Sequence, residues 1–300
     1  MKILISGSSG LVGKSLTTAL RADGHTVARL VRPGGSLAPG DVAWDPMAAT
    51  MDTAAIEGTD AVVHLSGASI AAGRWTSARK ALLRSSRIDT TRVLVDSLGN
   101  LRAKPSVFVC ASATGYYGDR GDEILTESSS TGTDFLALLA RDWEAEASRA
   151  ELSGIRTTVL RFGLILSKGG GALPRMLLPF RLGLGGRFGT GNQWMSWIGL
   201  EDAVGIVRSA ITDARFSGPW NVVAPNPVRN SEFTSILADV LHRPALFPVP
   251  AFALRMVLGE MADLLLLASQ RVVPARLAAM QYRFRFETLK AALEAVVTKG

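Results

Sequence analysis

The chain begins Met1-Lys-Ile-Leu-Ile-Ser-Gly7-Ser-Ser-Gly10-Leu-Val-Gly13, and this stretch decides the fold. Residues Lys2 to Ser6 are apolar enough to form a short buried strand. From Leu11 to Arg21 the apolar side chains recur at helical spacing, and His25 to Val31 is again typical of a strand. The opening therefore predicts a strand, a glycine-rich turn, a helix and a second strand.

The three glycines of this turn predict a phosphate-binding loop. Gly7 permits a tight turn, Gly10 lets a ligand approach the backbone, and Gly13 allows the helix to pack closely on the strand. The free N–H groups at the start of the helix then attract an anion. We expect a dinucleotide to contact Gly7, Ser8, Ser9, Gly10, Leu11, Val12 and Gly13; the alternative is a structural turn without a ligand.

The end of the second predicted strand indicates which dinucleotide binds. NAD sites usually carry Asp or Glu there for the ribose 2′-hydroxyl, whereas an Arg accommodates a 2′-phosphate. This chain offers Arg29 and Arg32, and no acidic residue until Asp41. Because a guanidinium donates a planar fork to phosphate, Arg32 favours NADP(H) over NAD(H).

The first half of the chain alternates strands with helices. This alternation predicts an α/β fold, a Rossmann doubly wound parallel sheet with helices on both faces. We expect further strands over Val42–Trp44, Ala61–Leu65, Ser106–Ala111 and Thr157–Arg161, and helices over Thr76–Leu98, Asp134–Leu152, Glu201–Thr212 and Asn230–Leu241.

The pattern loosens after about residue 165, which predicts a smaller C-terminal lobe. We expect an NADP(H)-binding Rossmann domain over residues 1–165. A substrate-cleft region interleaved with the core would follow over 166–243, including a glycine-rich segment at 168–191. A helical C-terminal extension would occupy 244–300.

Composition narrows the class of protein. The 300 residues have a net charge of +7, but the basic residues are scattered, so we expect small anionic ligands and no nucleic acid. A single cysteine, Cys110, suits a reducing compartment. No secretory signal is visible, and the apolar stretch 251–268 is interrupted by Arg255, Glu260 and Asp263, so we expect a cytoplasmic protein that does not enter a membrane.

Several motifs together resemble the extended short-chain dehydrogenase/reductases. They are GSSGLVG at 7–13, HLSGASI at 64–70, SSRIDTTRVL at 85–94, SATGYYGD at 112–119, LRFGLILSKGGGAL at 160–173 and WMSWIGLEDAV at 194–204. The resemblance is closest to the epimerase-type (NAD-dependent epimerase/dehydratase-like) branch that carries a C-terminal domain of unknown function. The tail PAFALRMVLGEMADLLL at 250–266 is similar to that domain.

The resemblance implies roles for individual residues. Leu65, Ser66, Gly67 and Ala68 would lie against the adenosine and ribose of the cofactor. Ser112 would match the family's catalytic Ser/Thr, which hydrogen-bonds the reacting oxygen. Arg161 and Gly163 would lie near the nicotinamide, and Trp197–Asp202 would close the substrate cleft.

The chain departs from the family at its catalytic Tyr-x-x-x-Lys pair. Its only tyrosines are Tyr116, Tyr117 and Tyr282, and no lysine lies between Lys104 and Lys168. Tyr116 or Tyr117, close to Ser112, can substitute as the proton donor. The alternative is that both tyrosines only line the pocket.

The remaining polar residues receive simpler interpretations. Glu144 and Glu146 are expected as exposed charges, His64 as a packed strand residue, and Arg87 either orients substrate or pairs with an acid. Arg175, Arg181 and Arg187 are candidate anion contacts, and no metal-ligand cluster is visible. The two long helices are compatible with a homodimer as well as with a monomer.

Two functions remain open. The first is an NADP(H)-binding oxidoreductase or epimerase of the extended short-chain dehydrogenase type, acting on a small, sugar-like or anionic substrate. The second is a dinucleotide-binding sensor or regulatory protein that keeps the cofactor site without the usual chemistry.

Overall fold

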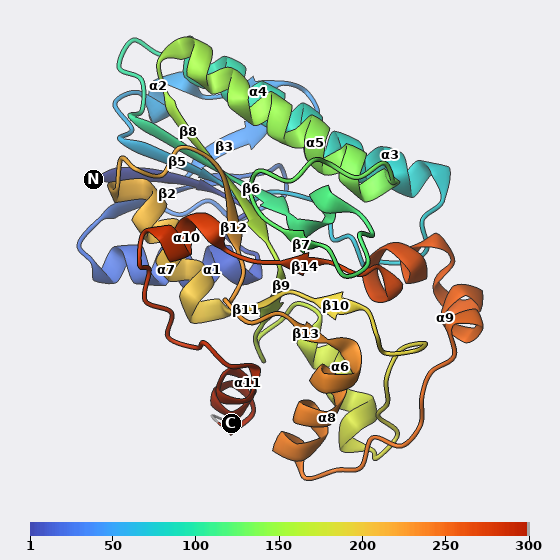
Figure 1. Cartoon of the computed structure of the whole chain (residues 1–300). Helices are drawn as coiled ribbons and strands as arrows, with labels where there is room; N and C mark the ends of the chain where they lie inside the picture. Colours follow the sequence, from blue (N-terminus) through green and yellow to red (C-terminus); the bar gives the residue numbers. More distant parts are fainter. Residues whose placement is uncertain (299–300) are drawn as a thin grey trace.

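The computed structural model describes residues 1–298 and confirms the α/β fold with a Rossmann-like sheet. Eight strands lie in the order β12-β8-β6-β5-β1-β2-β3-β4 (Figure 1), and all neighbours are parallel except β3 and β4. The strands are β1 (Lys2–Ser6), β2 (Thr26–Val31), β3 (Val42–Asp45), β4 (Thr50–Met51), β5 (Ala61–His64), β6 (Val107–Ala113), β8 (Arg156–Phe162) and β12 (Gly218–Val222).

Helices cover both faces of this sheet. One face carries α2 (Thr53–Ile56), α3 (Ser77–Ser85), α4 (Ile88–Gly99) and α5 (Phe135–Ser148), and the other carries α1 (Leu11–Ala22), α7 (Leu200–Thr212) and α10 (Ala275–Ala279). Successive side chains of β1 point into the hydrophobic cores on the two faces of the sheet. Leu4 packs in the core under α3, α4 and α5, and Ile3 and Ile5 pack in the core under α1 and α7. Both faces are buried, which explains the nearly continuous apolar strands.

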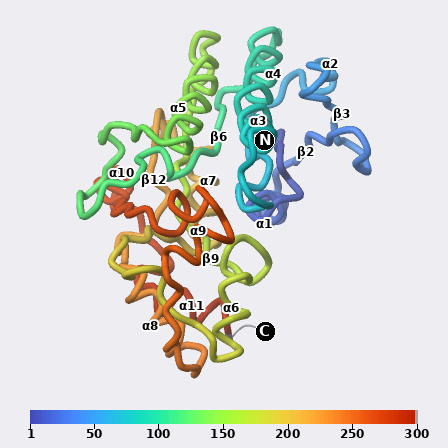
Figure 2. Tube along the Cα trace, turned by 90° about the vertical axis from the view of Figure 1, so that its right-hand side faces the viewer, coloured from blue at the N-terminus to red at the C-terminus, as the bar shows by residue number. Residues whose placement is uncertain are grey.

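A smaller lobe lies below the sheet (Figures 1 and 2). Its own core joins α6 (Leu173–Arg181), α8 (Asn230–Leu241) and α11 (Leu289–Thr298), with Leu177, Phe233 and Leu293 fully or nearly buried. The lobe also contains α9 (Ala251–Leu258), the π-helical turn η3 (Ala262–Leu267) and two short strand pairs. These pairs are β9 (Leu164–Leu166) with β11 (Trp197–Gly199) and β10 (Trp194–Met195) with β13 (Val228–Arg229). A third pair, β7 (Ile124–Leu125) with β14 (Arg271–Val272), packs against Tyr117 and Val223 of the core.

Two of the longer elements of the sheet and its helical layers differ from the sequence prediction. The helix expected over Thr76–Leu98 is interrupted, because α3 ends at Ser85 and α4 begins at Ile88, with Arg87 at φ −116° between them. The strand β12 was not predicted, since its sequence Gly-Pro-Trp-Asn-Val begins with two residues that strands disfavour. It pairs in parallel with β8 and extends the sheet by one strand.

The end of the chain returns to the core. Asp202, in the first turn of α7, is 3% exposed, and its carboxylate accepts hydrogen bonds from the backbone N–H groups of Arg285 (2.7 Å) and Phe286 (3.1 Å). The strand β14 pairs with β7 at the same time. The C-terminal segment is thus fastened to the Rossmann core at two separate places. Among the helices of residues 1–298, none is long and apolar enough to cross a membrane.

His64 is a packed strand residue, as the sequence predicts. Its side chain is fully buried on β5, with Nδ1 2.6 Å from the hydroxyl oxygen of Ser6 and the ring stacked 6.2 Å from that of Phe108. Burial lowers the pKa of His64 to about 3, because the charged imidazolium would lose its hydration.

We expect this histidine to make folding stability depend on pH. Between the ordinary value of about 6.5 and the folded value of about 3, only the unfolded chain binds the proton. The stability present above pH 6.5 is therefore lost as the pH falls through this window, by up to about 1.4 kcal/mol per pH unit. Urea unfolding at a series of pH values measures the slope. A His64→Asn variant, which cannot titrate, should flatten it, and an unchanged slope would contradict the assignment.

Candidate cofactor and active site

The glycine loop between β1 and α1 has no room for side chains at two positions. Gly7 has φ +70°, and a Cβ there would lie 2.6 Å from the carbonyl carbon of Leu65. A Cβ on Gly13 would lie 2.2 Å from the carbonyl oxygen of Gly7. A Cβ on Gly10 would make one tight contact, 3.2 Å from the carbonyl oxygen of Gly7. The loop needs glycine for its turn at Gly7 and for the approach of helix to strand at Gly13.

The start of α1 offers unoccupied hydrogen-bond donors beside this loop. Its N-cap is Gly10, which provides no side-chain cap, so the N–H groups of the first turn lack intrahelical acceptors. Ser9 is exposed and Ser8 half-buried next to them. On the other side, residues 65–68 follow β5 directly, and Leu65 contacts Gly7. These groups fit a pyrophosphate, because they combine free N–H donors, the helix dipole and a surface without side chains.

The two arginines near the end of β2 have different surroundings. Arg29 forms an ion pair with Asp41, whose side chain is only 2% exposed and also accepts a hydrogen bond from the Ala38 N–H (2.7 Å). The hydrogen bond from Arg29 lowers the pKa of Asp41 and holds it as a carboxylate. Arg32 is exposed and has no acidic partner among residues 1–298. The first acid after Arg32 in the sequence is therefore already neutralised, and Arg32 is available to a ligand.

A buried ion pair lies beneath the expected catalytic serine. Arg161 on β8 donates to both carboxylate oxygens of Glu144 on α5, at 2.9 and 2.8 Å, and their side chains are 4% and 12% exposed. Burial opposes the charge of Arg161, but these two hydrogen bonds raise its pKa above the ordinary value. The expectation that Glu144 is an exposed charge is wrong: the carboxylate turns inward because Arg161 is there to pair with it.

Ser112 belongs to the same network. It ends β6 beside Arg161 in the sheet register, is 4% exposed, and its hydroxyl donates a 2.6 Å hydrogen bond to Glu144. A serine whose proton is already donated can still accept a hydrogen bond through its oxygen lone pairs. In this arrangement Ser112 can orient a neighbouring donor, whereas donating to a substrate oxygen would require breaking the bond to Glu144.

The two adjacent tyrosines have separate environments in the 3-10 turn η1 (Thr114–Tyr117). Tyr117 is fully buried; its hydroxyl donates to Asn221 Oδ1 (2.7 Å) on β12 and accepts from Arg161 (2.9 Å). Burial raises the pKa of Tyr117 to about 12. Its hydroxyl is enclosed by the protein and does not reach a cleft.

Tyr116 has the free hydroxyl. The side chain is half-buried, and its ring lies over the guanidinium of Arg161, with 3.5 Å between Cζ and the ring centroid. Within residues 1–298 its hydroxyl has no hydrogen-bond partner. Of the two tyrosines considered as proton donors, Tyr116 is therefore the one whose oxygen remains available.

The other predicted residues take mainly structural places. Gly163 follows β8, and a Cβ on it would lie 2.6 Å from the carbonyl oxygen of Ser196, so it serves close packing. Trp197 is fully buried in the core of the lobe, and its Nε1 donates to the Asn226 carbonyl (2.9 Å). In the described part of the chain, no three His, Cys, Asp or Glu side chains come together in a group that could hold a metal ion.

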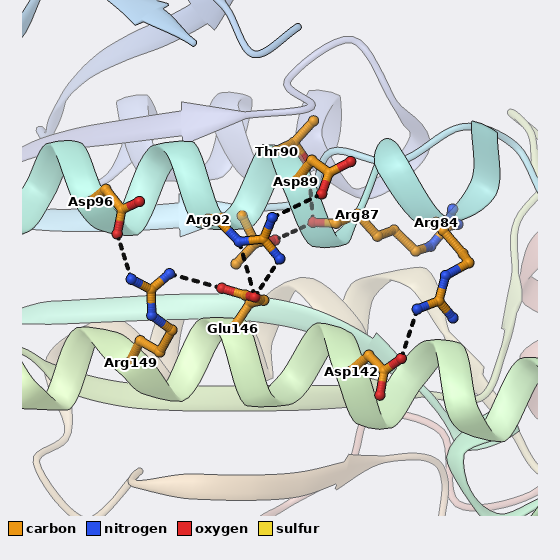
Figure 3. A network of polar contacts seen from close by, with 10 residues as sticks. Arg84, Arg87, Asp89, Thr90, Arg92, Asp96, Asp142, Glu146 and Arg149 are labelled. Carbon is orange, nitrogen blue, oxygen red and sulfur yellow. Dashed lines mark hydrogen bonds and ion pairs between the residues drawn. The ribbon is translucent and has the colours of Figure 1, made fainter. Parts of the chain in front are cut away.

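Glu146, two residues after Glu144, faces the opposite way. It receives hydrogen bonds from Arg92 (2.7 Å) and Arg149 (2.9 Å) on the outer surface between α4 and α5, where further ion pairs join the two helices (Figure 3). Its side chain is only 16% exposed, so the expectation that Glu146 is an exposed charge is also wrong, although the two arginines that pair with it are 46% and 42% exposed. One helix thus carries a glutamate in a buried ion pair and another in a solvated network.

The comparisons with known proteins agree with this geometry. The sequence profile of the "NAD dependent epimerase/dehydratase family" matches residues 3–222. The chain belongs to this family. A second profile, a "Domain of unknown function (DUF1731)", matches residues 249–296 and covers the segment that returns to the core. The resemblance stated from the motifs is thereby confirmed.

Several relatives match along nearly their full length. The epimerase family protein Mb2239 of Mycobacterium bovis is 42% identical over 99% of this chain and 98% of its own. YfhF of Bacillus subtilis is 39% identical over 99% of this chain and 98% of its own. The crystal structure of the human epimerase family protein SDR39U1 with NADPH has a TM-score of 0.91 and 34% identity, and the match covers both chains completely.

The two glutamates of α5 provide a matched test of the buried ion pair. Replacing Glu144→Gln leaves the Arg161 cation buried without its counter-charge, so we expect a loss of about 3–5 kcal/mol in the free energy of unfolding. Glu146→Gln, the same change in a solvated network, should cost less than about 1 kcal/mol. Urea unfolding measures both. Equal losses would show that Glu144 does not carry the stabilising charge.

Proposed function

We propose that this protein is an NADP(H)-dependent oxidoreductase or epimerase acting on a small, sugar-like or anionic substrate, with Tyr116 as the proton donor. The free Tyr116 hydroxyl, four residues beyond Ser112 at the end of β6, is the observation that carries the proposal. NADP(H), when bound, supplies or accepts a hydride. The protein's part is to hold the cofactor on the loop 7–13 and to exchange a proton at the substrate oxygen.

The buried network defines how Tyr116 would act without the Tyr-x-x-x-Lys pair. Arg161 and Glu144 position the Tyr116 ring, because the carboxylate of Glu144 holds the guanidinium of Arg161 in place and the ring packs on that guanidinium. Ser112, with its proton donated to Glu144, has only oxygen lone pairs left for a ligand. The arrangement therefore supports one donor, Tyr116, and one acceptor, Ser112, at the end of the same strand.

A sensor or regulatory protein is the second candidate. The commitment of the Ser112 hydroxyl to Glu144 and the enclosure of Tyr117 favour it, since both groups expected for chemistry are occupied by protein partners. Tight cofactor binding without turnover on any carbonyl or alcohol substrate would support this candidate over the enzyme.

NADP(H) is the cofactor that the site favours over NAD(H). Arg32 is exposed and without an acidic partner in the described chain, whereas Asp41, the first acid after it in the sequence, is consumed by Arg29. The human relative that has been crystallised with NADPH supports the same choice.

We expect Tyr116→Phe to reduce turnover at least about a hundredfold, because general acid catalysis contributes at that scale. The variant keeps the ring over Arg161, so binding of NADPH should not change. NADPH oxidation against a panel of aldehydes and ketones measures turnover, and fluorescence titration measures binding. Tyr282→Phe, on the far side of α7, is the control. Full activity of Tyr116→Phe would remove it as the acid.

A second variant tests the choice of cofactor. Arg32→Ala should weaken NADPH binding about tenfold or more, since a charge-assisted fork to phosphate contributes roughly 1.5–3 kcal/mol. The affinity for NADH, which lacks the 2′-phosphate, should stay the same. Fluorescence titrations with both cofactors measure the difference. Equal losses for NADPH and NADH would contradict the contact with the 2′-phosphate.

A further inference from the structure

Two segments beside the cofactor loop contain no acidic residue. Residues 65–88 include five basic residues, and residues 152–200 include six, with no Asp or Glu in either segment. These eleven basic residues exceed the net charge of +7, so the rest of the chain is net negative. The excess of positive charge therefore comes from these two segments, although Lys80, Arg84 and Arg161 within them pair with acids.

The two segments meet at the loop that follows β5. Four consecutive carbonyl groups of this loop each accept a hydrogen bond from a different side chain: Ala68 from Arg87 (3.1 Å), Ser69 from Arg79, Ile70 from Trp75 (2.9 Å) and Ala71 from Arg175 (2.9 Å). Arg175 comes from α6 of the lobe and Arg79 from α3, while Trp75 precedes α3 and Arg87 precedes α4. The loop Ala68–Ala71 is thus held from the core and from the lobe together.

The arginines at this loop have no counter-charges. Arg79, Arg87 and Arg175 form no ion pair within residues 1–298, although neighbouring cations do: Lys80 pairs with Glu260 (2.5 Å) and Arg84 with Asp142 (2.9 Å). The Nε of Arg79 is buried without a partner. Burial and the repulsion from Arg79 lower the pKa of Arg87 to about 10. Like charges that remain together without an acid are typical of a site that receives its anion from outside.

The backbone of the same loop adds further donors. The carbonyls of residues 69–71 are taken by side chains, but their N–H groups have no acceptor in the described chain. Arg74, a few residues further on, is exposed. It lies beside Gly259, the residue after α9, where a Cβ on the glycine would be 3.5 Å from Nη2 of Arg74. The loop is therefore contacted by a side chain from α3 and by one from α6, and Arg74 next to it lies beside the residue that follows α9.

We propose that the loop Ala68–Ala71, with Arg74, Arg79 and Arg175, forms a subsite for an anionic group of the substrate, a phosphate or a carboxylate. This inference rests on the proposed function and narrows its substrate class. Arg79 and Arg175 orient the loop, and the free N–H groups and the exposed Arg74 complete the set of donors. The ligand is expected to be a small carbonyl or alcohol compound that carries a phosphate or carboxylate.

This subsite is separate from the phosphate contacts of the cofactor. The candidate 2′-phosphate contact, Arg32, follows β2, whereas the loop follows β5, and β1 lies between these two strands. The pyrophosphate is assigned to the start of α1. Two anion sites on opposite sides of β1 allow cofactor and substrate to bind at the same time.

In the test, protein saturated with NADPH is titrated with inorganic phosphate at constant ionic strength. Isothermal titration calorimetry measures the binding. We expect one saturable site per chain. Arg74→Ala and Arg175→Ala should each weaken phosphate binding about tenfold or more, while NADPH affinity stays unchanged. Arg175→Lys should recover part of the loss. Arg243→Ala, an exposed arginine on the turn after α8, is the matched control and should have no effect.

The outcomes separate this inference from the proposed function. Absence of saturable phosphate binding, an equal loss in Arg243→Ala, or displacement of NADPH by phosphate would each overturn the subsite. Turnover of neutral aldehydes with no preference for anionic ones would overturn the subsite and leave the enzyme proposal intact. Phosphate binding that depends on Arg74 and Arg175, without turnover of any carbonyl compound, would keep the subsite and overturn the enzyme proposal.

Discussion

The bidentate ion pair between Arg161 and Glu144 is the interaction on which the central part of the molecule depends. It joins β8 to α5, and through Ser112 and Tyr117 it connects β6, η1 and Asn221 on β12. The chain of contacts continues to the C-terminal segment, because the Asn221 side chain donates to the Val273 carbonyl (3.0 Å). Since both charges are buried, neither partner can be lost without leaving the other uncompensated in a dry interior. This constraint fixes the spacing between the last strands of the sheet and the helix above them.

The same interaction determines which groups remain for chemistry. Ser112 and Tyr117 satisfy the hydrogen-bonding needs of the buried pair, and Tyr116, stacked on Arg161, keeps its hydroxyl free. The arginines also fall into two groups, those paired with an acid and those without an acidic partner. All four arginines lie in the two acid-free segments. Arg161 is neutralised by Glu144, whereas Arg79, Arg87 and Arg175 donate to backbone carbonyl groups and have no acidic partner in the described chain. The Arg161–Glu144 pair supports the Tyr116 ring, whereas the arginines without an acidic partner leave positive charge for a ligand.

Local patterns in the sequence were sufficient for much of the fold. The glycine spacing and the apolar periodicity predicted β1, α1 and β2 within a residue or two, because these elements follow from short-range geometry. The strand β12 escaped prediction, since its Gly-Pro start is tolerated only through its pairing with β8. Glu144 was misjudged although a signal existed: it lies four residues after Ala140 and eight after Leu136, on the buried face of α5. Its partner Arg161 lies 17 residues further on, on the strand β8, and helical periodicity cannot predict such a tertiary contact.

The return of the chain end to the core has a consequence for how the protein is made. The backbone amides that occupy Asp202 come from residues 285 and 286, and β14 pairs with a strand roughly 147 residues earlier, at β7. On the ribosome, which exposes the chain from its N-terminus, the sheet and α1 can assemble while these partners are still inside the exit tunnel. Asp202 and the edge of β7 must wait, solvated or unpaired, until residues 271–286 have been made and have left the ribosome. A nascent chain would therefore form its cofactor loop before these two contacts can form.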